Sequence, residues 1–145
     1  MEIRRATEAD IKVMRRLWDK FTVEATFAPY PGNPFEPALV TDHIALVAEE
    51  NGEAIGTVYA NLASPHFGFV FGRYTRPDAR RGGVARELMR EIATVLQDEG
   101  REYILLNVDT PNEDARAFYE SLGFVDAGRT LRADVRTLLG GTRRT

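Results

Sequence analysis

The residues best suited to chemistry form a glycine-containing turn between two predicted elements. They are Arg80, Arg81, Gly82, Gly83, Val84 and Ala85, with Arg86 next in the chain. The turn follows an aromatic, strand-prone run at 67–75 and opens an amphipathic helical pattern at 84–99. Adjacent glycines expose backbone N–H groups, and the first N–H groups of a helix have no internal partner. Such a turn, with its arginines, is suited to binding phosphate or pyrophosphate. The same sequence pattern also occurs in a simple turn whose arginines are only exposed to solvent.

A second group of polar and aromatic residues lies toward the C-terminus. Its spacing predicts a helix over 112–122 that ends at Gly123. Asn112 stands before two acidic residues and suits a helix N-cap. Tyr119 carries a phenol, which can donate a proton, but the same helical face could also bury it beside Phe118 in the core.

The elements that must position these residues can be predicted from periodicity and turn signals. A capping box at Thr7–Asp10 starts the first helix, Asn51–Gly52 marks a tight hairpin, and prolines interrupt regular structure over 26–37. The predicted strands cover 3–5, 44–49, 54–62, 67–75 and 103–108, with one or two more within 124–139. The predicted helices cover 11–21, 36–42, 84–99 and 112–122. This order predicts a mixed sheet with helices on its faces and a ligand at the carboxyl end of the 67–75 strand.

Length and composition limit the class of protein. The 145 residues suit one domain, which we expect to span 1–139, with a disordered tail at 140–145. A net charge of −3 gives no general attraction to nucleic acid or anionic membranes, so neither is expected as a partner. The sequence has no cysteine, which excludes disulfides and a cysteine nucleophile, and its two histidines form no metal-ligand pattern. Without a signal-peptide core or a long apolar run, a cytoplasmic protein is expected.

Together, the two groups of residues resemble the GNAT superfamily of acetyl-CoA-dependent N-acetyltransferases. The family's cofactor motif is Arg or Gln, two residues, Gly, one residue, then Gly or Ala, and Arg80–Ala85 follows it. Pro77 stands where the family often has a proline after its fourth strand. The second family signature is matched, in order and spacing, by Asn112, Ala115, Phe118, Tyr119 and Leu122–Phe124. The resemblance covers residues 44–128.

The resemblance implies an α/β fold of the α+β type. It would have a mixed, mostly antiparallel sheet of six to seven strands, helices on both faces, and splayed fourth and fifth strands. The glycine turn would hold the pyrophosphate of acetyl-CoA, and the splayed strands, 69–75 and 103–108, would bind the pantetheine amides. A backbone N–H near 73–75 would stabilise the oxyanion of a tetrahedral intermediate. Beyond the turn, the implied cofactor contacts are Arg73, Tyr74, Thr75, Asn112, Ala115, Phe118 and Tyr119.

The chemistry implied by the resemblance is direct attack of an amine on the acetyl thioester, without an enzyme nucleophile. Tyr119 matches the family tyrosine near the cofactor sulfur and would protonate the departing thiolate. The base is less defined, because the 67–75 run has no carboxylate where many members carry a glutamate. His66 is one candidate, although a histidine there could be a plain loop residue; Asp109, Tyr74 through water, or water alone are others.

The amine acceptor is expected at the family's variable loop, here 26–37. Three aromatic residues and four prolines make this loop stiff, and it could hold an apolar group or a cation, or instead fold onto its own domain. Glu24 and Asp42 flank the loop and could attract a cationic amine. The expected acceptor contacts are Phe27, Tyr30, Phe35 and Asp109.

Two other functions are also compatible with the sequence. A domain of the same fold could bind or sense acyl-CoA without catalysis, which the missing strand carboxylate favours and Tyr119 argues against. A nucleic-acid module would use the arginines of the 73–90 region, but the acidic residues Asp78 and Glu87 reduce the net positive charge of that region. Dimerisation is common in this fold, so a homodimer is a further possible partner.

Overall fold

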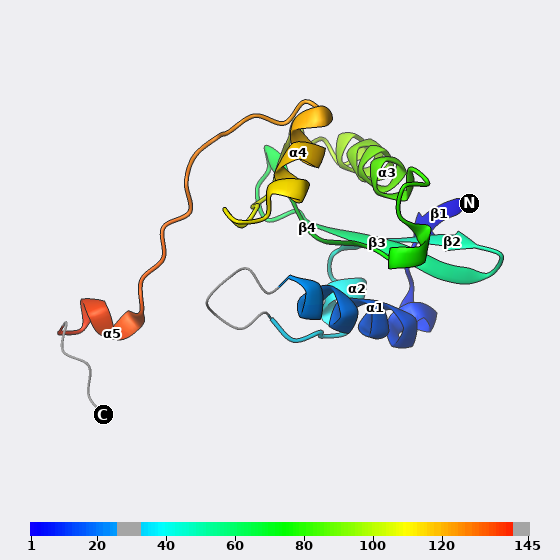
Figure 1. Cartoon of the computed structure of the whole chain (residues 1–145), viewed down its shortest axis with the longest axis horizontal. Coiled ribbons are helices and arrows are strands. Elements are labelled where there is room, and N and C mark those ends of the chain that lie inside the picture. Colours follow the sequence, from blue (N-terminus) through cyan, green and yellow to red (C-terminus); the bar gives the residue numbers. More distant parts are fainter. Residues whose placement is uncertain (26–32, 141–145) are drawn as a thin grey trace.

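A central sheet with helices on both faces organises the chain in the computed structural model, which describes residues 1–25 and 33–140 (Figure 1). The strands are β1 (Glu2–Arg5), β2 (Ile44–Glu50), β3 (Glu53–Asn61), β4 (Phe67–Thr75) and β5 (Tyr103–Leu105). The α-helices are α1 (Ile11–Glu24), α2 (Ala38–Thr41), α3 (Val84–Asp98), α4 (Glu113–Ser121) and α5 (Val135–Leu138). Short 3-10 turns, η1 (Glu8–Asp10) and η2 (Pro77–Ala79), precede α1 and α3.

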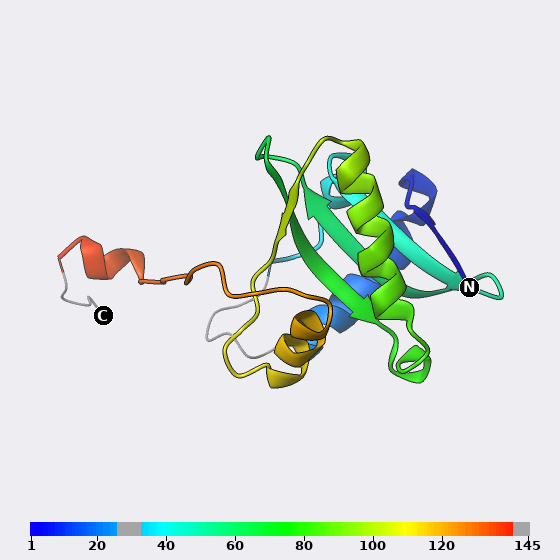
Figure 2. The same ribbon diagram turned by 90° about the horizontal axis from the view of Figure 1, so that it is seen from above.

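The sheet has the order β1-β2-β3-β4-β5. The first four strands are antiparallel, whereas β4 and β5 are parallel and are joined through α3, which lies across one face (Figure 2). Asn51 and Gly52 turn the β2–β3 hairpin with φ angles of 53° and 79°, the left-handed pair that a two-residue hairpin turn needs. The predicted hairpin and the α+β class with a mixed sheet are therefore confirmed.

β4 and β5 are paired over only part of their length. Phe67–Phe69 pairs with Tyr103–Leu105, after which β5 ends and β4 runs on through 70–75. β5 is thus shorter than the predicted 103–108. Among the described residues, no strand pairs with 70–75 on the β5 side. This part of β4 is an edge with backbone groups that are available to another partner.

Two apolar layers hold the helices against the sheet. α3 and α4 cover one face, hereafter the α3 face, and α1 and α2 cover the other, hereafter the α1 face (Figure 1). On the α1 face, Trp18 lies edge-on to Tyr59, with ring centroids 5.3 Å apart, and to Phe35 at 6.3 Å. The buried core on the α3 face includes Ile44, Val58, Val70, Leu88, Ile92, Leu96 and Tyr119.

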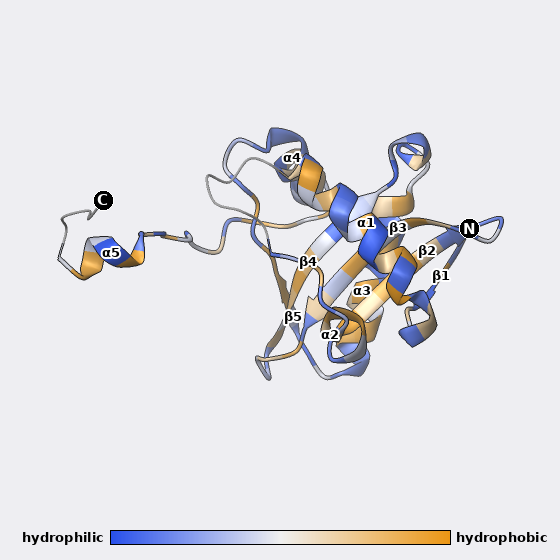
Figure 3. Cartoon of the chain, turned by 90° about the horizontal axis from the view of Figure 1, so that it is seen from below, coloured by the Kyte–Doolittle hydropathy of each residue, from blue (hydrophilic) through white to orange (hydrophobic). Residues whose placement is uncertain are grey.

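The prediction of a final strand or two within 124–139 is wrong, because the described sheet has five strands rather than six to seven. Residues 124–134 form no strand, and the chain runs away from the sheet to α5, which carries apolar residues (Figures 1 and 3). The segment 126–129 has no β-branched or aromatic residue, so its own preference for a strand is weak. Within 124–140, five large apolar side chains are at least 70% exposed: Val125, Leu131, Val135, Leu138 and Leu139. Of the tail predicted to be disordered, 141–145 lies outside the described residues.

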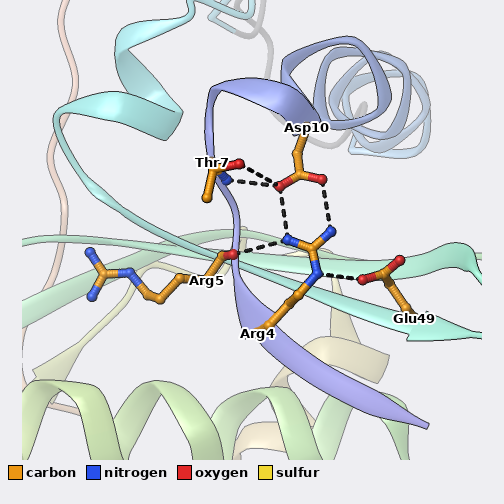
Figure 4. Close-up of polar contacts among 5 residues, drawn as sticks. All are labelled: Arg4, Arg5, Thr7, Asp10 and Glu49. Carbon is orange, nitrogen blue, oxygen red and sulfur yellow. Dashed lines mark hydrogen bonds and ion pairs between the residues drawn. The ribbon is translucent and has the colours of Figure 1, made fainter.

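Arg4 joins the first strand to the start of α1 and to the β2 strand (Figure 4). Its guanidinium donates to both carboxylate oxygens of Asp10, at 2.8 and 2.9 Å, and to the carboxylate of Glu49. Asp10 also accepts from the backbone N–H of Thr7 at 2.8 Å, in the predicted capping box. The Arg4 guanidinium lowers the pKa of the Asp10 carboxyl to about 2. The start of the chain is therefore fixed to the sheet by a charged cluster.

Candidate functional site

A β-bulge interrupts β4 within the part that pairs with β3 but has no β5 partner. Val58 of β3 faces two residues of β4, Gly72 and Arg73, because the register shifts between Thr57 and Tyr59. Gly72 has a φ of +64°, and a Cβ atom there would lie 2.6 Å from Cδ1 of Tyr59, so only glycine fits. The Thr57 hydroxyl donates to the Gly72 carbonyl at 3.1 Å and holds the bulge in place.

The bulge changes the face toward which the following side chains point. Phe71 lies on the α1 face, stacked on Tyr59 with ring centroids 5.4 Å apart. In an uninterrupted strand, residues 71 and 73 would share a face. Arg73 instead reaches α4 on the α3 face, where it contacts Tyr119. The extra residue therefore brings a charged side chain to the helix that carries the predicted acid.

Tyr119 is buried, and its hydroxyl is engaged by Arg73. Nε of Arg73 donates to the Tyr119 hydroxyl oxygen at 2.8 Å. The same guanidinium lies 4.6 Å from the ring centroid of Phe118 and 5.3 Å from that of Tyr119. The Tyr119 ring also packs edge-on against Phe118 and Phe124, at 5.2 and 5.5 Å. Tyr119 thus packs in the core and holds a directed hydroxyl at the same time.

The start of α4 is fixed by Asn112. Its side-chain oxygen accepts from the backbone N–H of Ala115 at 3.2 Å, and its own N–H donates to the Asp109 carbonyl at 2.8 Å. Asn112 therefore acts as the predicted N-cap. Ala115 and Phe118 pack against the core on the α3 face, which sets the rotation of α4 and with it the direction of Tyr119.

The predicted phosphate turn has the backbone that an anion site needs. Arg81 and Gly83 have φ angles of 73° and 81°, and α3 begins directly afterwards at Val84, whose side chain is buried. A non-glycine residue in the left-handed region costs about 1 kcal/mol and often marks a functional site. A Cβ atom at Gly83 would meet nothing within 4 Å, so the turn faces open space. No described side chain caps the start of α3, and the first N–H groups of a helix have no internal partner, so this turn has the backbone geometry of an anion site; Ala85 and Arg86 lie in the first turn of α3.

Arg80 is directed toward the protein and not toward the open space. Its Nε donates to the Thr75 carbonyl at 2.8 Å, its Nη2 pairs with the Glu24 carboxylate at 2.6 Å, and it lies over the Tyr74 ring. Within the described part of the chain, Arg81 and Arg86 have no such ion pair. These two arginines, rather than Arg80, are thus the ones free to meet an anion.

The end of β4 carries two further predicted contacts. Burial, with the Glu24 carboxylate nearby, raises the pKa of the Tyr74 phenol above its ordinary value. Tyr74 is therefore protonated at neutral pH, and its ring lies beneath the Arg80 guanidinium. The hydroxyl of Thr75 is buried and has no hydrogen-bond partner among the described residues. A buried hydroxyl without a partner is costly to the fold, and the Tyr59 hydroxyl is a second such atom among the described residues.

Several predicted residues do not join this cluster. His66 precedes β4, and its carbonyl accepts from the backbone N–H groups of Glu102 and Tyr103. Six strand residues, 67–72, separate it from Arg73, a distance of about 20 Å. Phe35 is buried in the core of the α1 face, under the guanidinium of Arg15. Of the remaining predicted acceptor contacts, Phe27 and Tyr30 lie outside the described residues, and Asp109 precedes α4.

Sequence reasoning missed the side-chain roles of Arg73 and Thr57. Arg73 was expected to contribute its backbone, and its contact with Tyr119 joins residues 46 positions apart. One signal was present, because an isolated glycine within a strand pattern, here Gly72, indicates a bulge. Over 1–25 and 33–140, no group of three or more acidic or histidine side chains could hold a metal ion, and no helix is long and apolar enough to cross a membrane.

Comparisons with known proteins agree with this geometry. The model of the Acetyltransferase (GNAT) family matches residues 11–124. A mycothiol acetyltransferase of Streptomyces coelicolor is 36% identical over 80 residues, which are 54% of this chain and 26% of the relative. The chain thus matches about a quarter of the length of that relative.

Solved structures show the same fold at low identity. A ribosomal-protein-alanine N-acetyltransferase from Brucella melitensis has a TM-score of 0.75 and 22% identity, covering 92% of this chain and 99% of that one. A structure described as a predicted acetyltransferase with acetyl-CoA, from Clostridium acetobutylicum, has a TM-score of 0.75 and 19% identity, covering 93% and 96%. With the family model matched across the sheet, the glycine turn and α4, this chain belongs to the GNAT acetyltransferase family.

Proposed function

We propose that this chain transfers an acetyl group from acetyl-CoA to a primary amine. The observation that carries the proposal is the stretch of β4 that has no β5 partner, 70–75, which runs between the turn before α3 and the hydroxyl of Tyr119. A phosphate-binding turn, a free strand edge and a proton donor are the three elements that binding and cleaving a coenzyme A thioester requires.

The turn before α3 is suited to the pyrophosphate. Its left-handed residues, Arg81 and Gly83, turn backbone N–H groups toward open space, and the helix dipole favours negative charge there. Arg81 and Arg86 add charge that no described carboxylate neutralises. Arg80 has a different task, since it holds the turn to the end of β4 through the Thr75 carbonyl.

The free edge of β4 is suited to the pantetheine chain. An extended ligand with amide groups can add to an unpaired strand edge and bond to its backbone. The bulge at Gly72 and Arg73 takes backbone groups out of the regular ladder beside this edge. One such N–H, within 73–75, would stabilise negative charge on the thioester oxygen.

Tyr119 is the proposed acid. It would give its phenolic proton to the sulfur as the C–S bond breaks, and would regain a proton from water. Water would also accept the proton that the amine loses as the C–N bond forms, so one proton leaves the nitrogen and one reaches the sulfur. His66 is too far from Arg73 and Tyr119 to serve as the base, and Tyr74 is protonated. Bound water is therefore the proposed base, and Asp109, just before α4, is the carboxylate among the predicted candidates.

A thiol-release assay tests the proposal. Acetyl-CoA is incubated with the chain and a panel of primary amines: a peptide with N-terminal alanine, lysine, a polyamine and an aminoglycoside. Tyr119→Phe should lower kcat by about a hundredfold or more, while coenzyme A affinity measured by calorimetry stays nearly unchanged. Tyr103→Phe, at an exposed tyrosine at the start of β5, is the matched control.

The second candidate is an acyl-CoA-binding or sensing domain without catalysis. The absence of any carboxylate from β4 favours it, because no residue of that strand can deprotonate the amine. Tight coenzyme A binding without thiol release for any amine of the panel would establish this candidate in place of acetyl transfer. Loss of coenzyme A binding altogether would exclude both.

A further inference from the structure

We propose that the side chain of Arg73 is a positioning residue for Tyr119, fixing its hydroxyl so that the phenolic proton is left for the departing sulfur. The proposal rests on the proposed acetyl transfer. It goes beyond that proposal because Arg73 was predicted as a cofactor contact, with an oxyanion-stabilising backbone N–H near 73–75, whereas the structure gives its guanidinium a specific partner.

The direction of the hydrogen bond decides which way the phenolic proton points. A guanidinium has only donors and no acceptor, so Tyr119 can accept from Arg73 but cannot donate to it. The bond from Nε, at 2.8 Å, therefore occupies a lone pair of the hydroxyl oxygen and leaves the O–H free. An acceptor on the far side of the hydroxyl, such as a sulfur leaving group, would be the group that receives this proton.

The guanidinium is held in one place by rings on α4. It lies 4.6 Å from the centroid of Phe118 and 5.3 Å from that of Tyr119. A planar guanidinium stacked on an aromatic face loses little freedom when it forms a hydrogen bond, since it is already ordered. The bulge at Gly72 supplies the second constraint, because it directs Arg73 to the α3 face.

The charge of Arg73 is not neutralised by any carboxylate among the described residues. Taking a charged group partly out of water costs free energy unless a counter-charge or hydrogen bonds compensate it. A leucine or methionine at this position would pack against Phe118 without that desolvation cost. When Tyr119 gives up its proton, its oxygen becomes negative beside the guanidinium, which is where a positive charge is most useful.

A double-mutant cycle tests this role. The variants are Arg73→Met, Tyr119→Phe and the double variant, assayed with acetyl-CoA and the fastest amine of the panel. Arg73→Met should lower kcat by about ten- to a hundredfold in the wild-type background. It should have little further effect in the Tyr119→Phe background, because the residue acts through the missing hydroxyl. The KM for acetyl-CoA and the affinity for coenzyme A should stay within about twofold.

Two further variants narrow the interpretation. Arg73→Lys keeps the charge but not the planar donor, so it should restore only part of kcat. Arg76→Met removes one positive charge near the same strand end, where Arg76 pairs with the exposed Asp78 and Glu53, and should leave kcat unchanged. Equal losses from Arg73→Met in both backgrounds, or a change in KM instead of kcat, would overturn the positioning role.

A measurement without turnover separates failure of this inference from failure of the proposed function. The Nε–Hε signal of Arg73, observed by ¹⁵N NMR, should be shifted in the wild type and return toward that of a free arginine in Tyr119→Phe. A signal that does not respond to Tyr119→Phe would refute the contact, whether or not any amine is acetylated. A response with no thiol release would keep the contact and reject acetyl transfer.

Discussion

Thr57 and Gly72 are joined across β3 and β4 by a hydrogen bond of 3.1 Å from the threonine hydroxyl to the glycine carbonyl. Thr57 is almost fully buried, so this bond is formed away from water, where its loss would leave a polar group without a partner. It fixes the bulge that turns Arg73 toward Tyr119. The position of the proposed acid and the shape of the sheet are thus set by the same local departure from regular strand geometry.

Gly72→Ala should destabilise the fold and misdirect Arg73. The new Cβ atom would lie 2.6 Å from Cδ1 of Tyr59 and 2.8 Å from Cζ3 of Trp18, at a φ of +64°. Steric conflict in a packed core and left-handed strain together predict a loss of about 2–4 kcal/mol in the free energy of unfolding, measured by urea titration. Gly128→Ala is the control, since its Cβ would meet nothing within 4 Å, and it should change stability by less than about 0.5 kcal/mol. Equal stability of the two variants would contradict the bulge.

The sequence predicted the local features of the fold better than the distant ones. The capping box at Thr7–Asp10 and the Asn51–Gly52 hairpin depend on neighbouring residues, and both are present. The short length of β5 and the absence of strands at 124–134 depend on whether a neighbouring strand offers backbone groups to pair with. The local sequence pattern does not contain that information. To predict the contact of Arg73 with Tyr119, one would have to know at which residue the bulge lies. A shift of one position reverses the face of every side chain that follows.

Arg81→Gly should have opposite effects on the stability of the chain and on its affinity for coenzyme A. Arg81 has a φ of 73°, so glycine should relieve left-handed strain and raise the free energy of unfolding by up to about 1 kcal/mol. Removing the charge should weaken coenzyme A binding several-fold, with a smaller salt dependence, measured by calorimetry at two ionic strengths. Gly83→Ala is the counterpart, because it adds strain at a φ of 81° without a steric clash and keeps the charge. Unchanged affinity in Arg81→Gly would remove Arg81 from the pyrophosphate site.

Asp10→Asn should reveal the acid sensitivity of the charged cluster at Arg4. The pKa of Asp10 is about 2 in the folded chain and 3.8 in its ordinary range, so its carboxylate contributes stability above pH 4 that is lost as the pH falls toward 2. Allowing for solvent screening, the variant should be less stable by about 1 kcal/mol at pH 7. The difference from the wild type should shrink between pH 4 and pH 2 in thermal unfolding. Glu8→Gln, in the same 3-10 turn, should show no such convergence. A stability difference between Asp10→Asn and the wild type that stays constant from pH 4 to pH 2 would argue against the lowered pKa of Asp10.

Arg80 offers a test of whether the phosphate turn depends on its attachment to β4. Its bond to the Thr75 carbonyl and its ion pair with Glu24 can be removed separately. Arg80→Met removes both, frees the turn from the strand end and should weaken coenzyme A binding about tenfold, since a misplaced turn loses several N–H contacts together. Glu24→Gln removes only the ion pair, whose side chains are each 45% exposed, and should cost less than about 1 kcal/mol of stability and no affinity. Arg80→Gln keeps a donor near Thr75 and should fall between the two. If Glu24→Gln weakened coenzyme A binding as much as Arg80→Met, the ion pair rather than the Thr75 bond would be what positions the turn.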